Sequence, residues 1–109
     1  MLNQRAEQLD VVFHALSDPS RRSIVERLTG GSATVTELAE PLPMSMPAVL
    51  QHLQVLEHSG IVRSRKVGRV RECRIDAEAL GPAGNWIEAR KAGWARRLDQ
   101  LGDYLAESE

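Results

Sequence analysis

The chain of 109 residues is poor in cysteine, in aromatic residues and in long apolar runs. Its single cysteine excludes an internal disulfide framework and any all-cysteine metal site within one chain. Aromatic residues make up 4% of the chain, which is too few for the stacking surfaces that bind single-stranded nucleic acid. No apolar run could span a bilayer, and the N-terminal stretch lacks the apolar segment of a signal peptide. We therefore expect one cytoplasmic domain over residues 1–109 with no membrane partner.

Motifs that support catalysis or cofactor binding are also missing. The chain has no glycine-rich phosphate loop, no Ser/His/Asp set and no paired carboxylates, so no enzyme activity is expected. His14, His52 and His58 are not spaced as a chelating pair on one helix, so we expect neither a metal site nor a cofactor. The lone Cys73 is best interpreted as a small apolar filler.

Positive charge is concentrated in one segment of the chain. Residues 61–75 hold six basic residues and one acidic residue, a local charge of +5, and the remaining eight basic and fourteen acidic residues sum to −6. Lysine and arginine are absent from residues 28–62. A basic segment on an acidic body favours binding to an anionic partner.

Apolar residues recur at helical spacing in stretches that end near residues 16, 30, 42, 59 and 106. The first helix is predicted over residues 1–16 and the last over residues 85–106. A glycine pair at 30–31 ends the second helix, and the prolines at 41 and 43 end a short third helix. Residues that suit helix N-caps precede the later elements: Asp18, Thr36, Ser45, Asp76 and Asn85.

Between the fourth and last helices the period changes to that of strands. Residues 61–66 and 70–75 have the pattern of two strands about a turn at Gly68. The fold is thus predicted to be mostly α-helical with a small β-hairpin. Its order suits a winged helix-turn-helix, with the helix-turn-helix at 36–59 and the hairpin, or wing, at 61–75. The other interpretation is an α+β domain in which the helix pair serves only for packing.

The segments HALSDPSRRSIVERL and VTELAEPLPMSMPAVLQHLQVLEHSGIVRSRKVGRVRECRI lie within residues 9–76. This part of the chain resembles the arsenic-repressor (ArsR) family of winged helix-turn-helix transcription regulators. The resemblance implies a homodimeric repressor that binds a partly palindromic operator in double-stranded DNA. It also implies that the fourth helix enters the major groove and that the wing touches the flanking minor groove or backbone. The helices at 1–16 and 85–106 would then form the dimer.

Two features depart from the family pattern. Leu50 stands where a small polar residue is frequent, and it either faces the core or contacts a thymine methyl group. Metal-sensing relatives have Cys-x-Cys on the third helix or Asp/His and His/Glu pairs on the last. This chain has Glu37 to Glu40 at the first place and no histidine at the second. DNA binding without metal sensing is therefore expected, and an unknown small-molecule effector stays open.

The fourth helix has to recognise DNA without a cation. Glutamine pairs with the N6 and N7 atoms of adenine, and Gln51 and His52 are expected on the turn that faces the groove. The alternatives are a solvated Gln51 and a phosphate contact from His52. The candidate contacts on this helix are Ser45, Met46, Ala48, Gln51, His52 and Gln54.

The wing would supply the cations for DNA. Arg69, beside the Gly68 turn, is the candidate for the minor groove, where narrow A·T tracts attract arginine. Of Arg21 and Arg22 at the start of the second helix, one is expected to pair with an acid and the other to reach phosphate. Alternatively, the basic residues lie on a solvated edge strand, where their charge prevents aggregation. A second class of function is a protein-interaction module in which the basic wing binds an acidic partner. The wing contacts expected on DNA are Arg65, Lys66, Arg69 and Arg71.

The last helix holds both tryptophans of the chain. Its apolar stripe exceeds what the core of one small chain needs, which favours a dimer interface. The alternative is a ligand pocket between the terminal helices, lined by tryptophan. The residues expected at the interface are Leu9, Val12, Phe13, Trp86, Trp94, Leu98, Leu101 and Leu105.

Overall fold

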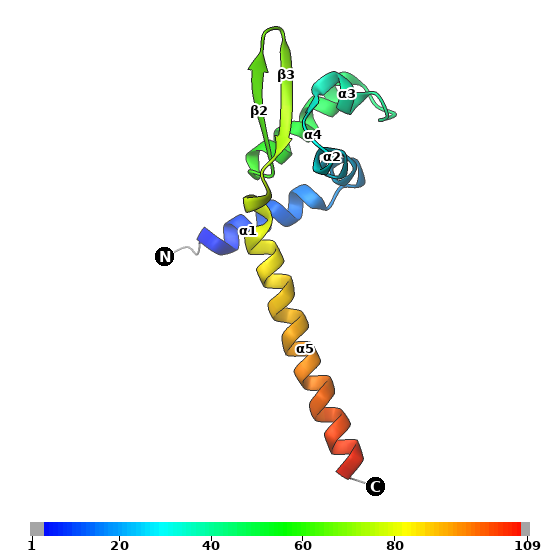
Figure 1. Cartoon of the computed structure of the whole chain (residues 1–109), viewed down its shortest axis with the longest axis vertical. Coiled ribbons are helices and arrows are strands. Elements are labelled where there is room, and N and C mark those ends of the chain that lie inside the picture. Colours follow the sequence, from blue (N-terminus) through cyan, green and yellow to red (C-terminus); the bar gives the residue numbers. More distant parts are fainter. Residues whose placement is uncertain (1–3, 108–109) are drawn as a thin grey trace.

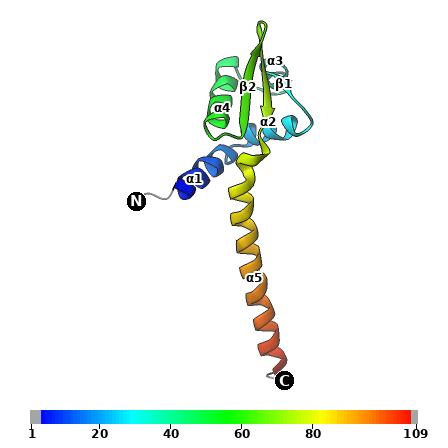
Figure 2. The ribbon, with the colours of Figure 1, turned by 60° about the vertical axis from the view of Figure 1, so that its left-hand side comes forward.

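The computed structural model describes residues 4–107, so the first three positions of the predicted first helix lie outside it. Its elements follow the predicted order (Figure 1), with one short strand added (Figure 2). None of the described helices is both long and apolar enough to cross a membrane. The elements are α1 (Gln4–Leu16), α2 (Pro19–Thr29), β1 (Ala33–Thr34), α3 (Val35–Ala39), α4 (Met46–His58), β2 (Val62–Val67), β3 (Val70–Ile75), the 3-10 turn η1 (Ala77–Leu80) and α5 (Gly81–Glu107).

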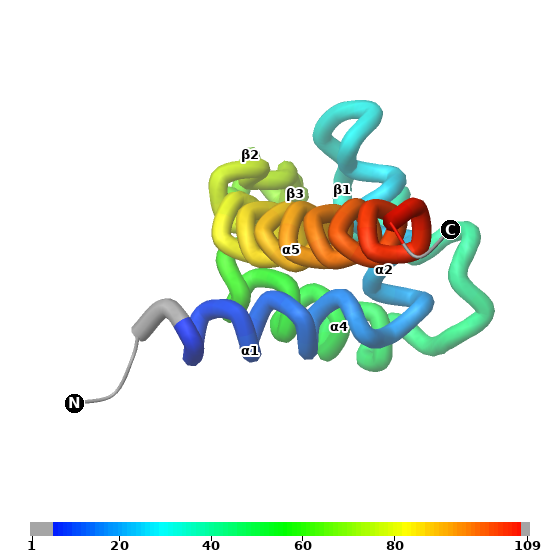
Figure 3. Tube along the Cα trace, turned by 90° about the horizontal axis from the view of Figure 1, so that it is seen from below, coloured from blue at the N-terminus to red at the C-terminus, as the bar shows by residue number. Residues whose placement is uncertain are grey.

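Helix α5 extends away from a head that the other elements form (Figures 1 and 2). It has 27 residues, which corresponds to a length of about 40 Å. The molecule measures 70 × 37 × 21 Å and its radius of gyration is 19.2 Å, whereas a compact chain of this length would have about 13 Å. Seen from below, α1 lies on one side of α5 and the β2–β3 hairpin on the other (Figure 3). Most of α5 therefore lacks a neighbour within one chain.

The hairpin belongs to a three-stranded antiparallel sheet in the order β1-β3-β2. Gly68 makes the turn with a φ of +65°, a conformation that favours glycine. Strand β1, which the sequence pattern did not indicate, pairs Ala33 with Cys73 and Thr34 with Glu72. Beyond Glu72, toward the turn, the sheet has only two strands.

The core lies between the helices of the head and the sheet. One face of α4 is buried there, with Val49, Leu53 and Leu56 at most 1% exposed. Ile24 of α2 and Ile61 before β2 are buried with them. Burying a side chain of this size stabilises a protein by about 1.5–3 kcal/mol. One face of α4 is thus fixed in the core, and its opposite face is left for contacts with other molecules.

Polar caps determine where the helices begin. The Oδ1 atom of Asp18 accepts hydrogen bonds from the backbone N–H groups of Ser20 and Arg21, at 2.8 and 3.1 Å. The bond from Arg21 and the bond from Ser20 hold the pKa of Asp18 below its ordinary value. Ser45 caps α4 and Asp76 caps η1, so these predicted caps are confirmed together with Asp18.

Two predicted caps are wrong. Helix α3 begins after Thr34, not Thr36, because Thr34 and Glu37 form a reciprocal capping pair with N···O distances of 3.0 and 3.1 Å. Helix α5 begins at Gly81, not after Asn85. Pro82 lies in its first turn, where a helix requires no backbone donor, so this proline does not interrupt the helix. The last helix therefore spans 81–107 and not 85–106.

Arg21 connects α1, α2 and α4 at one point. Its Nε donates to the Ala15 carbonyl at 2.8 Å and its Nη2 donates to the His14 carbonyl at 3.0 Å. The carbonyls at a helix end need such partners, because no later turn supplies a donor. Its Nη1 lies 3.1 Å from Nδ1 of His52 on α4. We call this arrangement the Arg21 junction, and the arginine in it is only 9% exposed.

We expect Arg21→Ala to lower the free energy of unfolding by about 2–4 kcal/mol, because it leaves the buried Ala15 carbonyl without its charged donor and removes the link to His52. Arg22→Ala is the matched control. Arg22 is exposed and donates one bond, at 2.8 Å, to the Leu16 carbonyl. A loss below about 1 kcal/mol is expected there. Urea denaturation followed by circular dichroism measures both values, and equal losses would contradict the junction.

Candidate nucleic-acid interface

The exposed face of α4 mixes polar and apolar side chains. The Oγ atom of Ser45 accepts from the N–H of Ala48 at 3.3 Å, so this hydroxyl caps the helix at the start of the exposed face. Gln51 is exposed, Met46 is 41% exposed and Ala48 is half-buried. Gln54 is also exposed, but it lies at the edge beside α1, where it lines a groove together with Asp10 and His58 among others. The predicted contacts on α4 thus divide between two sides of the helix.

Leu50 lies on the outer surface of α4 and not in the core. It is 41% exposed, as is Met46 four positions before it. Residues four apart on a helix share a face, so these two side chains form one small apolar surface. Of the two interpretations of Leu50 from the sequence, the core-facing one is wrong.

Arg21 and His52 point into the protein. The buried Arg21 is occupied by the junction described above, so its predicted role as a DNA contact is corrected to a structural one. The His52 side chain is 20% exposed, and its Nδ1 lies 4.0 Å from Oδ1 of Asp18 as well as close to Arg21. Arg22 remains exposed at the start of α2.

Half of the six wing cations are paired with acids. Arg63 donates to Asp76 at 2.8 Å, and this bond holds the pKa of the Asp76 carboxyl below its usual range. Arg65 lies 3.5 Å from Glu72 on the neighbouring strand. These two arginines therefore have an acidic partner within the chain. The wing cations that form no ion pair within the described residues are Lys66, Arg69 and Arg74.

Glu57 near the end of α4 is the partner that sequence reasoning missed. Its two carboxylate oxygens accept from Nη2 of Arg71 at 2.5 and 2.7 Å. Glu57 has no basic residue three or four positions away on its own helix, and this was the available signal that its partner lies elsewhere. The predicted phosphate contact Arg71 is thus bound to an acid of α4.

Cys73 lies in the middle strand and is fully buried. Burial raises the pKa of its thiol, and the nearby Glu57 carboxylate acts in the same direction. This environment fits the interpretation of Cys73 as a small apolar filler. Over residues 4–107, no three His, Cys, Asp or Glu side chains gather in a way that would hold a metal ion.

The apolar stripe of α5 is exposed along most of its length. Trp86 packs edge-on against Phe13 of α1, with ring centroids 5.9 Å apart, and the Arg90 guanidinium lies 5.0 Å from the Trp86 ring. Val12 is 4% exposed and belongs to the core, so its assignment to a dimer interface is corrected, and Leu9 packs partly against the same core. The stripe residues that remain 52–62% exposed are Trp94, Leu98, Leu101 and Leu105.

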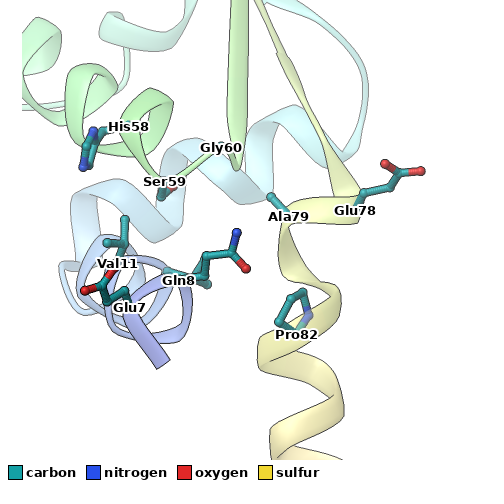
Figure 4. Close-up of a pocket in the computed structure, with 10 residues that line it drawn as sticks. Glu7, Gln8, Val11, His58, Ser59, Gly60, Glu78, Ala79 and Pro82 are labelled. Atoms are coloured by element: carbon teal, nitrogen blue, oxygen red, sulfur yellow. The ribbon is translucent and has the colours of Figure 1, made fainter. Parts of the chain in front are cut away.

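A hollow of about 570 Å³ lies between α1, the end of α4 and the start of α5 (Figure 4). Its lining includes Glu7, Gln8, His58 and Glu78 but neither tryptophan. The tryptophan-lined pocket between the terminal helices, which was one interpretation of the stripe, is therefore not found in this hollow.

These features define a class of protein. Helices α3 and α4 are joined by a tight turn and followed by a hairpin with free cations near its tip, which is the arrangement of a winged helix-turn-helix domain. A family model described as a helix-turn-helix domain matches residues 16–65.

Comparisons with known proteins agree with this class. The chain is 40% identical to the HTH-type transcriptional regulator Rv2034 of Mycobacterium tuberculosis, over 86% of this chain and 92% of the relative. It is 32% identical to the transcriptional repressor SdpR of Bacillus subtilis, over 70% and 84%. The crystal structure of the ArsR family transcriptional regulator RHA00566 has a TM-score of 0.78 at 42% identity, over 83% and 93%. The winged helix-turn-helix domain Mb0332 of Mycobacterium bovis, described as homodimeric, has a TM-score of 0.65 at 26% identity, over 84% and 90%.

The chain belongs to the ArsR family of helix-turn-helix transcriptional regulators. The predicted fold class and the predicted function as a DNA-binding regulator are confirmed at this level.

Proposed function

We propose that two copies of this chain bind a partly palindromic operator in the cytoplasm and repress transcription by excluding the polymerase. Each α4 lies in the major groove, and each wing lies against the flanking minor groove. The observation that supports this most directly is the pairing of a cation-free exposed helix face with a hairpin whose tip has unpaired cations. Base recognition and phosphate attraction then fall to different elements.

Phosphate attraction comes from a small set of cations. Lys66 and Arg69 near the turn have no acidic partner among the described residues, and Arg22 is exposed at the start of α2. Each phosphate that such a cation neutralises contributes about 0.9 to the slope of log affinity against log salt. Gln51 on α4 contributes to sequence preference, because its amide pairs with the adenine edge.

The proposed function predicts that the protein enriches particular sequences from a pool of random DNA duplexes. We expect inverted repeats whose half-sites are about one helical turn apart, since a two-fold dimer presents two α4 helices. Sequencing of the bound pool measures this enrichment. Binding to acidic polypeptides without any sequence enrichment would favour the interaction module and contradict the proposal.

Added Zn²⁺ is expected to leave the affinity for DNA unchanged, because α3 has Glu37 in its capping pair at the family's metal-binding position. Fluorescence anisotropy with and without Zn²⁺ measures this outcome.

We expect Leu50 to contact a thymine methyl group in the major groove. Replacing the contacted thymine by deoxyuridine removes only that methyl group, which costs about 0.8 kcal/mol or roughly fourfold in Kd. Leu50→Ala should weaken binding to the thymine duplex and make the protein indifferent to the replacement. Gln51→Ala is the control, because it should keep the fourfold response while losing adenine discrimination. An equal response to deoxyuridine in all three proteins would refute the contact.

The dimer is proposed to form through the exposed stripe of α5 and through α1. Trp94, Leu98 and Leu101 are 62%, 52% and 53% exposed in one chain. Side chains of this size are rarely left in water along a whole helix face, and a second copy would bury them. The winged helix-turn-helix domain from Mycobacterium bovis is described as homodimeric, which supports pairing of two copies.

Trp94→Glu is expected to shift the dimer to monomer at micromolar concentration, because it places a charge in an apolar interface. Ala92→Glu is the matched control. At about 100° per residue, position 92 lies roughly opposite to position 94, so this variant should remain dimeric. Sedimentation velocity measures both states. A monomeric wild type, or an equal shift by the two variants, would argue against this interface.

A further inference from the structure

The end of the wing is connected to α4 by one cluster of side chains. Arg71 of β3 donates to both carboxylate oxygens of Glu57 on α4, at 2.5 and 2.7 Å. Its Nε also donates to the Ser64 hydroxyl of β2 at 2.8 Å, and that hydroxyl donates to the same Glu57 carboxylate. The three residues, which we call the Glu57 cluster, come from three different elements.

The position of the cluster in the sheet gives it a specific mechanical effect. The third strand ends its pairing at Glu72, so the hairpin has only two strands from there to the turn. Every residue from 65 to 71 is exposed, so no core packing holds this part in place. Isolated two-stranded hairpins are marginally stable in water. Among the described residues, the hydrogen bonds of Arg71 therefore connect the distal hairpin to the helix.

The cluster also determines which cations are available for DNA. The Glu57 carboxylate neutralises Arg71 at the shortest ion pair of the wing. The cations near the turn that lack such a partner within residues 4–107 are Lys66 and Arg69. Arg69 lies in the turn directly before β3, two residues from Arg71 in the chain. The direction of the hairpin at Arg71 consequently determines the position of Arg69 relative to α4.

We propose that the Glu57 cluster fixes the angle between the wing and α4, and that Arg71 is a positioning residue and not a phosphate contact. With α4 in the major groove, this angle directs Arg69 into the adjacent minor groove, and so gives the operator its preference for A·T-rich flanks. The inference rests on the proposed function, because it assumes that α4 and the wing bind the same duplex.

The decisive variant is the charge-neutral pair Glu57→Gln/Arg71→Gln in the full chain. Its matched control is Glu88→Gln/Lys91→Gln, which removes an ion pair of the same net charge on α5, outside the wing, and leaves the link to α4 intact. Two quantities are measured by anisotropy on duplexes selected from a random pool. One is the salt slope, and the other is the ratio of affinities for A·T-rich and G·C-rich flanks around one selected half-site pair.

We expect the Glu57→Gln/Arg71→Gln variant to keep the wild-type salt slope while its flank ratio falls to about 1. The control pair should keep both quantities. Arg69→Ala should lower the flank ratio and also flatten the slope by about 2 per dimer. Ser64→Ala, which changes no charge and is expected to fold, should lower the flank ratio at constant slope, so the inference stays testable if the double variant is unstable.

A slope flattened by about 2 in the Glu57→Gln/Arg71→Gln variant would show Arg71 to be a phosphate contact and overturn the inference. An unchanged flank ratio in that variant or in Ser64→Ala, or a wild type indifferent to its flanks, would overturn it equally. These results leave the proposed function standing, since the wild type still selects its duplexes. A wild type that selects no duplex overturns both.

Discussion

The orientation of α4 depends on the buried guanidinium of Arg21. Its donors satisfy the last carbonyls of α1 and its third nitrogen meets His52, so three helices converge on one charged group. A planar fork with several fixed donors suits this task, and a lysine could not reach the same three partners in one geometry. Asp18 completes the arrangement, because its carboxylate caps the helix that begins with the arginine. Contacts on the inward side of α4 therefore determine which of its residues are exposed.

Acidic residues near the wing neutralise part of its positive charge. Asp76, Glu72 and Glu57 each take one arginine, and the remaining free charge lies near the turn and at the base of the hairpin. The electric field of the wing is therefore local. The two opposite charges of a close ion pair cancel each other at distances beyond the Debye length, which is about 8 Å at physiological salt. The protein as a whole, with a net charge of −1, then has little attraction for an anionic partner outside the wing.

The sequence predicted those features that depend on neighbours along the chain. Asp18 and Ser45 begin helices because their side chains bond backbone groups two or three residues later, and Gly68 makes a turn by its own conformation. The two-residue strand β1 was missed because it is too short to show an alternating pattern. Arg21 and Arg22 are adjacent and alike in sequence, and only the packing of α1 against α2 separates a buried donor from an exposed one. Pairs such as Glu57 with Arg71 depend on tertiary structure, which periodicity does not reveal.

The length of α5 beyond the head has a consequence for how the regulator responds to its own abundance. In the proposed dimer, the exposed part of α5 finds its neighbour in the second copy, and this couples assembly to concentration, because the bound state gains stability by mass action. Below the concentration at which copies pair, the number of assembled molecules rises with the square of the number of chains. A modest change in synthesis or degradation is thereby amplified at the promoter. In the proposed dimer, the exposed helix thus makes the amount of assembled regulator depend steeply on the supply of the protein.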